Sequence, residues 1–230
     1  MHQPLTDLIS IETLDRDGAL RESADAVAGD TRADLFRKAG IAGGSLLASS
    51  VLFGGLPALA GAAKPSKRQD VAILNYALTL EYLEAAFYKE AVQQGRFSGL
   101  IGAFAGIVYD HEAAHVAYLK RALGRAAVAS PRFDFADTTT DEAKFKATAF
   151  ALENTGVKAY AGQATNIKQP AVVRAAVSIL TIEARHAAAI AALLGHVPGS
   201  DGITPDGAFD KALSRAKILR AVGDTGFIVR

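Results

Sequence analysis

The chain has 230 residues, half of them hydrophobic, and its formal net charge is +1. This length suits one domain with additional segments, and so small a net charge gives no electrostatic reason to expect a nucleic-acid partner. The chain has no cysteine and its single methionine is Met1, which excludes disulfides, iron–sulfur clusters and haem bound by an internal thioether.

The sequence begins with a polar extension at 1–38, followed by an uncharged, glycine-rich stretch at 39–63. Basic residues before this stretch and the small-residue run Ala58-Leu59-Ala60 near its end are typical of an export signal. The run from Thr31 to Lys38, TRADLFRK, is similar to a twin-arginine signal, although Ala33 stands where the second arginine would be. We therefore expect export to the cell envelope or periplasm. The alternatives are an uncleaved membrane anchor and a helix buried against a partner subunit.

A short linker at 64–69 leads into a region, 70–195, that favours an all-α fold, because it contains no convincing strand pattern. Capping residues, glycines and one proline predict four helices, at 70–93, 98–123, 141–166 and 170–194. The loops inside the first and second pairs of helices are short, so each pair should form an antiparallel hairpin. The connection at 125–139 is long enough to run back along a helix, which predicts a four-helix bundle with one long crossover.

Residues 196–230 form the predicted tail. Thr204 and Pro205 could open a short helix that continues to Ala221. We expect this tail to cap one end of the bundle or to contact another subunit, and we assign it no chemical role.

Two of the predicted helices carry the motif Glu-x-x-His. Glu112 and His115 lie on the second helix, and Glu183 and His186 lie on the fourth. Residues three apart share one face of a helix, so each motif directs a carboxylate and an imidazole to the same point. Apolar residues flank both glutamates at helical spacing, which predicts that these faces point into the core.

The first and third helices contribute Glu81 and Glu153, which also lie on apolar stripes. Each is followed seven residues later by a tyrosine on the same face, Tyr88 and Tyr160. The chain thus contains two similar hairpins, related by an approximate two-fold repeat. Four buried carboxylates are costly without cations, whereas four carboxylates and two histidines suit two divalent metal ions. The sequence therefore predicts a dinuclear metal site.

The order Glu…Glu-x-x-His…Glu…Glu-x-x-His resembles the ferritin-like di-iron carboxylate superfamily. The run from Ile73 to Tyr88, ILNYALTLEYLEAAFY, is most similar to its branch of exported proteins related to desiccation-associated proteins. The resemblance implies a ferritin-like bundle with two iron ions per chain, or manganese ions as the alternative. It implies bridging roles for Glu112 and Glu183. The terminal ligands would be Glu81 with His115 and Glu153 with His186, and the two tyrosines would hydrogen-bond to carboxylates of the opposite hairpin.

Four neighbouring residues have more than one interpretation. Glu84 is either an additional metal ligand or a charge at the rim of the bundle. Asp110 either orients a histidine or lies exposed, and we place both acids, with the two tyrosines, in a second layer around the metals. His111 is expected to point away from the site into solvent, and His196 is expected to cap a helix C-terminus.

The function that the resemblance implies is stress-protective oxidation or sequestration of iron(II), with dioxygen or peroxide as oxidant. No catalytic residue beyond the metal ligands is predicted. One alternative is a dimanganese enzyme resembling catalase or peroxidase. Another is a structural or desiccation-protective protein in which the metals only stabilise the bundle. We expect a homo-oligomer, at least a dimer, with membrane contact possible through residues 39–63.

Overall fold

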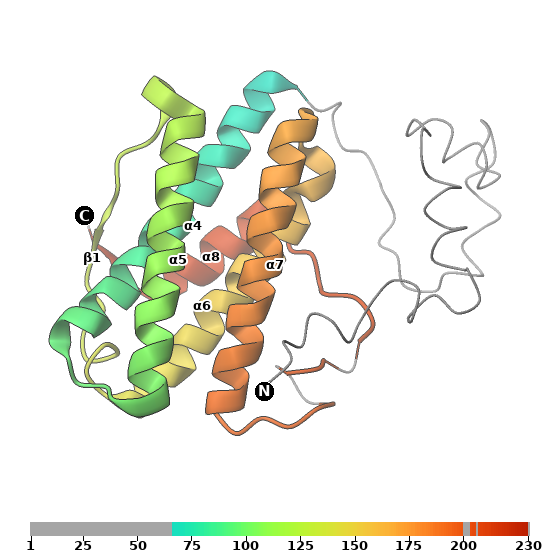
Figure 1. Cartoon of the computed structure of the whole chain (residues 1–230). Helices are drawn as coiled ribbons and strands as arrows, with labels where there is room; N and C mark the ends of the chain where they lie inside the picture. The colour runs from blue at the N-terminus through green and yellow to red at the C-terminus, as the bar shows by residue number, and fades with distance from the viewer. Residues whose placement is uncertain (1–65, 200–202, 206, 230) are drawn as a thin grey trace, which may run out of the picture. The chain divides into compact units, whose positions relative to one another are not determined.

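The computed structural model describes residues 66–199, 203–205 and 207–229. The predicted extension at 1–38 and the signal or anchor at 39–63 lie outside these residues. Five α-helices are described, α4 (Lys67–Gln94), α5 (Gly99–Leu123), α6 (Glu142–Gln163), α7 (Pro170–Leu193) and α8 (Arg215–Asp224). Helix α4 packs mainly on α5, and α6 packs mainly on α7 (Figure 1). These pairs are the two predicted hairpins, and the all-α four-helix bundle is confirmed.

Local signals explain where the helices begin and end. The Ser66 hydroxyl accepts a hydrogen bond from the Gln69 amide, which lets α4 begin three residues before its predicted start. The helix ends at Gly95, whose φ of 60° is accessible to glycine at little cost. The Asp141 carboxylate caps α6 through the Lys144 amide, and Pro170 occupies the first turn of α7.

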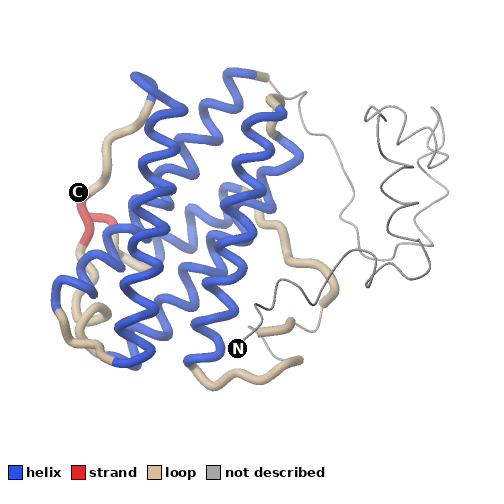
Figure 2. Tube along the Cα trace, viewed as in Figure 1, coloured by secondary structure: helices blue, strands red, loops and turns tan. Residues whose placement is uncertain are grey.

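The crossover and the tail pair with each other on one side of the bundle (Figure 2). Strand β1 (Arg132–Phe133) lies antiparallel to β2 (Ile228–Val229). The tail helix does not open at Thr204 as expected; it begins at Arg215, after the cap Ser214. The reason is a tertiary contact, because the Leu213 amide donates to the Lys158 carbonyl of α6 at 3.1 Å.

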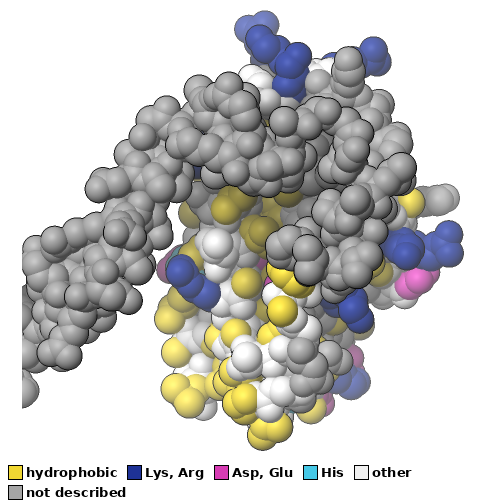
Figure 3. Space-filling view, turned by 90° about the vertical axis from the view of Figure 1, so that its right-hand side faces the viewer, with side chains coloured by type: hydrophobic (Ala, Val, Ile, Leu, Met, Phe, Trp, Pro, Cys, Tyr) yellow, Lys and Arg dark blue, Asp and Glu magenta, His cyan; other side chains and the backbone are white. Residues whose placement is uncertain are grey.

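Helix α7 is the one described helix that is long and apolar enough to cross a membrane, by length and composition. A core helix meets the same criterion, and Glu183 and His186 of α7 are buried in the bundle. On the face drawn in Figure 3, hydrophobic side chains lie among other types, with lysine and arginine at the edges. Within the described chain, 39% of this apolar stretch of α7 is buried, so the helix packs one face, which carries Glu183 and His186, against the bundle.

Asp70 joins the two hairpins near one end of the bundle. Its fully buried carboxylate accepts hydrogen bonds from the Lys168 amide at 2.8 Å and the Gln169 amide at 2.9 Å, just before α7 begins. Hydrogen bonds to a charged group contribute about 1.5–3 kcal/mol each, so Asp70→Ala should lower the free energy of unfolding by at least about 2 kcal/mol. Denaturant unfolding of metal-free protein measures this loss. Asp70→Asn, which keeps one acceptor, should lose less; equal stability of all three proteins would contradict the assignment.

Candidate metal centre

The six predicted ligands meet in the middle of the bundle, one or two from each of the four long helices. The carboxylates of Glu81, Glu112, Glu153 and Glu183 have no solvent exposure. His186 is 5% exposed, and the His115 side chain is 12% exposed. The apolar stripes on which these residues lie therefore face the core, and the carboxylates on the same stripes are buried there.

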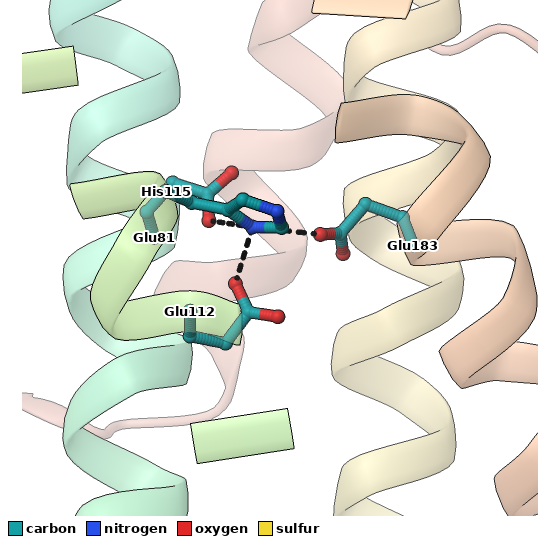
Figure 4. Close-up of side chains that lie close together, drawn as sticks. All are labelled: Glu81, Glu112, His115 and Glu183. Carbon is teal, nitrogen blue, oxygen red and sulfur yellow. Dashed lines mark hydrogen bonds and ion pairs between the residues drawn. The ribbon is translucent and has the colours of Figure 1, made fainter. Parts of the chain in front are cut away.

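The first group of possible ligands consists of Glu81, Glu112, His115 and Glu183 (Figure 4). His115 Nδ1 lies 3.1 Å from Glu81 Oε2 and 3.0 Å from Glu112 Oε2. The same nitrogen lies 3.5 Å from Glu183 Oε1, which approaches from α7. Three helices thus direct four donor atoms to one point.

The second group consists of Glu112, Glu153, Glu183 and His186, all of them buried. His186 Nδ1 lies 3.1 Å from Glu153 Oε2 and 3.2 Å from Glu112 Oε1. Within each group the donor atoms lie within 4.8 Å of one another. Glu112 and Glu183 belong to both groups, whereas the other four residues belong to one group each.

The two tyrosines act across the hairpins. Tyr88 of α4 donates its hydroxyl to Glu153 Oε1 of α6, and Tyr160 of α6 donates to Glu81 Oε1 of α4, both at 2.5 Å. The second oxygen of each carboxylate then faces a histidine, His186 or His115 respectively. This reciprocity is the approximate two-fold repeat of the sequence, expressed in hydrogen bonds.

The carboxylates are only partly compensated by the protein. Glu112 Oε1 and both oxygens of Glu183 are buried without a hydrogen-bond partner among the described residues. Burial raises the pKa of Glu81 to about 8, with a further rise from the charge of Glu112. Burial also raises the pKa of Glu153 and of Glu183. Burial would do the same to Glu112, but its contacts with the two histidines outweigh that effect and lower its pKa to about 2.

The histidines supply the positive charge that the chain itself can offer. Burial alone would lower their pKa values, but contacts with Glu112 and Glu81 raise the pKa of His115 to about 10. Contacts with Glu112 and Glu153 raise the pKa of His186 to about 9. The protein therefore holds protons at this cluster near neutral pH. The donor set fits two divalent cations, which would take the place of those protons.

The metal-free protein should lose stability as the pH rises from about 4.5 to about 10. The pKa of Glu81 is about 8 in the folded state, against an ordinary value of 4.5, so this carboxyl holds its proton to higher pH when the protein is folded. His115 and His186 hold theirs up to about 10 and 9, against 6.5. The folded state therefore binds more protons than the unfolded state across this window, and unfolding becomes easier as pH increases. Thermal unfolding with chelator present measures the trend, and a melting temperature that rises between pH 6.5 and 8 would contradict it.

Glu84 and Asp110, the two acids of uncertain role, lie in different places. Glu84 is 3% exposed, and its Oε1 lies 3.4 Å from where a Cβ on Gly156 would be. A Cβ at that point would also lie 2.5 Å from Glu183 Oε2, so the missing side chain of Gly156 leaves room for both carboxylates. Burial raises the pKa of Glu84 well above its usual value. Asp110 is exposed.

His111 is exposed, as expected, but the prediction that it points away from the site was wrong. Its Nδ1 lies 2.8 Å from His186 Nε2, and the two rings are stacked 17° from parallel. The reason is that the residue before each Glu-x-x-His motif faces the neighbouring helix at the α5–α7 interface. His196 contributes its backbone amide to the end of α7 by donating to the Ala191 carbonyl, while its ring packs on Phe150.

One comparison with known proteins bears on this arrangement. A model of the ferritin-like domain family matches residues 69–196, more than half of the chain. The match contains all six predicted ligands and the four long helices except the first two residues of α4. No curated protein matches the chain.

Proposed function

The chain belongs to the ferritin-like domain family, and we propose that it binds two iron ions between its four helices and oxidises iron(II) with dioxygen or peroxide. The observation that carries this proposal is the pair of four-residue groups that share Glu112 and Glu183. Two carboxylates that belong to both groups could each contact two adjacent ions. Removing free iron(II) in this way would protect the cell from iron-driven oxidative damage.

The ligand roles follow from membership of the two groups. Glu112 and Glu183 would bridge the ions, because each belongs to both groups. Glu81 with His115 would complete one ion's ligands, and Glu153 with His186 would complete those of the other. Four carboxylates balance the charge of two dications, so the buried site would be neutral overall.

The chain's own residues position the metal ligands and bury them away from solvent. Tyr88 and Tyr160 hold Glu153 and Glu81 through short hydrogen bonds, so each terminal carboxylate keeps one oxygen free for a metal ion. Bound iron would supply the redox chemistry: two iron(II) ions would give up one electron each, and these electrons with two protons would convert one peroxide to two waters or one dioxygen to peroxide.

Anaerobic titration of metal-free protein with iron(II), followed by air or peroxide, tests the proposal. We expect two ions bound per chain and oxidation faster than in buffer with heat-unfolded protein. Two ions bound with no acceleration would favour the reading in which metals only stabilise the bundle. Rapid oxygen release from peroxide by manganese-loaded protein would favour the catalase-like reading. Both outcomes would overturn iron oxidation as the function.

We propose that this activity takes place in the cell envelope, on the basis of the signal-like residues 31–63, and that the chain works as a homo-oligomer of at least two chains. Expression of the full chain in bacteria, followed by fractionation, tests the location. We expect deletion of residues 39–63 to leave the protein in the cytoplasm. If residues 39–63 are retained as an anchor, deletion should instead release the protein from membranes. An unchanged distribution and an unchanged size in solution would contradict both roles.

A further inference from the structure

The two histidine ligands have different neighbours. His186 uses Nδ1 toward Glu153 and Glu112, and its Nε2 lies 2.8 Å from His111 Nδ1. His115 also uses Nδ1 toward its carboxylates. Among the described residues, however, the hydrogen bonds and ion pairs of His115 all involve Nδ1. The His186 ring is therefore held through both of its nitrogens, and the His115 ring through one.

The contact with His111 suits His186 as a metal ligand. A histidine that binds a metal through Nδ1 must carry its proton on Nε2. That Nε2–H would then donate to the free lone pair of His111 Nδ1. Partners of this kind fix the tautomer and the ring orientation of a ligand, and they raise its basicity. His111 is thus in place to act through His186 as a positioning residue.

The repeat of the sequence explains the difference between the two halves. Glu112 and Glu183 are equivalent positions, so the residue before each motif is His111 in one half and Ile182 in the other. Ile182 has no hydrogen-bonding side chain and cannot hold His115 in the same way. In the same alignment of the two helices, Phe104 of α5 corresponds to Ala175 of α7.

A groove of about 560 Å³ opens at the less supported half. It is lined by residues of α5 and α7 that include His115, Tyr118, Ala175, Ser178 and Ile182. Phe104, the counterpart of Ala175, is 8% exposed and packs against Tyr88 at a ring distance of 6.0 Å. In the half of His115, Ala175 lines both this groove and a cavity of about 20 Å³ beside Tyr160, the counterpart of Tyr88, so a small side chain borders both spaces where the other half has an aromatic ring.

We propose that the two metal positions are inequivalent: His111 holds the ion bound by His186, whereas the ion bound by His115 exchanges through the groove. This inference rests on the proposed two-ion site. It further states that the ion at His186 is retained, whereas the ion at His115 is taken up and released. The groove is then the route by which a divalent cation reaches the buried cluster.

Cobalt(II) is a suitable probe, because its binding can be followed by visible absorption without turnover. Wild-type protein loaded with two cobalt ions should release them to a chelator in a fast and a slow phase. His111→Ala should speed the slow phase about 10- to 100-fold and leave the fast phase unchanged. His111→Asn, whose amide oxygen can accept the same hydrogen bond, should restore most of the slow release. Lys120→Ala, an exposed change on the same helix, should match wild type.

Ala175→Phe, which copies the filled half, should slow the fast phase alone. Equal acceleration of both phases by His111→Ala, no rescue by His111→Asn, or an unchanged fast phase in Ala175→Phe would each overturn the inference. Circular dichroism of the metal-free variants shows whether they are folded. If His111→Asn restores the slow release of cobalt without a matching change in stability, His111 acts by positioning His186 and not by stabilising the fold. If wild-type protein binds fewer than two ions, the proposed two-ion site itself is refuted.

Discussion

Replacing Glu112 by alanine should abolish tight binding of both metal ions. Glu112 is fully buried and belongs to both ligand groups, and it lies 3.0 Å from His115 and 3.2 Å from His186. Loss of a second-layer residue typically weakens metal binding 10- to 100-fold. Loss of a ligand shared by two ions should cost more, so we expect each affinity to fall at least about 100-fold.

Titration calorimetry and elemental analysis after dialysis measure this loss. Glu142→Ala provides the matched control, because Glu142 is an exposed glutamate of the first turn of α6 whose partner is Lys146. That variant should keep two ions per chain. Circular dichroism of metal-free Glu112→Ala shows whether the bundle is still helical, which separates a loss of ligands from a loss of folding. Full occupancy in Glu112→Ala would sink the assignment of the ligand groups.

Gly156→Ala should weaken metal binding although alanine favours helices. Replacing glycine inside a helix normally stabilises it by about 1 kcal/mol. At position 156, however, the new Cβ would lie 2.5 Å from Glu183 Oε2 and 3.3 Å from its carboxyl carbon. The Glu183 carboxylate would have to move, and both proposed ions depend on it. We expect at least about a tenfold loss of affinity for each, at the lower end of what changes around a ligand produce.

Gly106→Ala on α5 is the control, since a Cβ there meets nothing within 4 Å. It should leave metal binding unchanged and raise the melting temperature slightly. Crystals of Gly156→Ala should show a displaced Glu183 side chain. Wild-type affinity together with an undisplaced carboxylate would show that the cluster is looser than the structure indicates.

Most of the bundle could be predicted because its signals are local. Serine, aspartate, proline and glycine act within one turn of a helix, so Asp141, Pro170 and Gly95 mark the ends of helices in any surroundings. Two boundaries moved by about one turn: Ser66 starts α4 early, and the last three residues of the predicted third helix, 164–166, form a 3-10 turn after α6. The tail helix was misplaced because its start depends on the contact between Leu213 and Lys158, which are distant in sequence.

The metal cluster was also visible in the sequence, for a physical reason. Buried carboxylates on apolar faces need cations, and the helical period brings Glu112 and Glu183 onto the same faces as their histidines. The repeat of Glu, Tyr and Glu-x-x-His made a second, matching half easy to find. These features can be predicted from the helical period and from the free-energy cost of burying charged groups.

By itself, then, the sequence determined the all-α bundle, its hairpins and the six residues gathered in its core, because helix geometry and charge burial act within one helix. Only the tertiary structure decided how the two halves differ. Whether His111 reaches His186, and whether Gly156 leaves room for Glu183, depends on the distance between neighbouring helices. That distance is set by packing across the whole core, and no short stretch of sequence contains it.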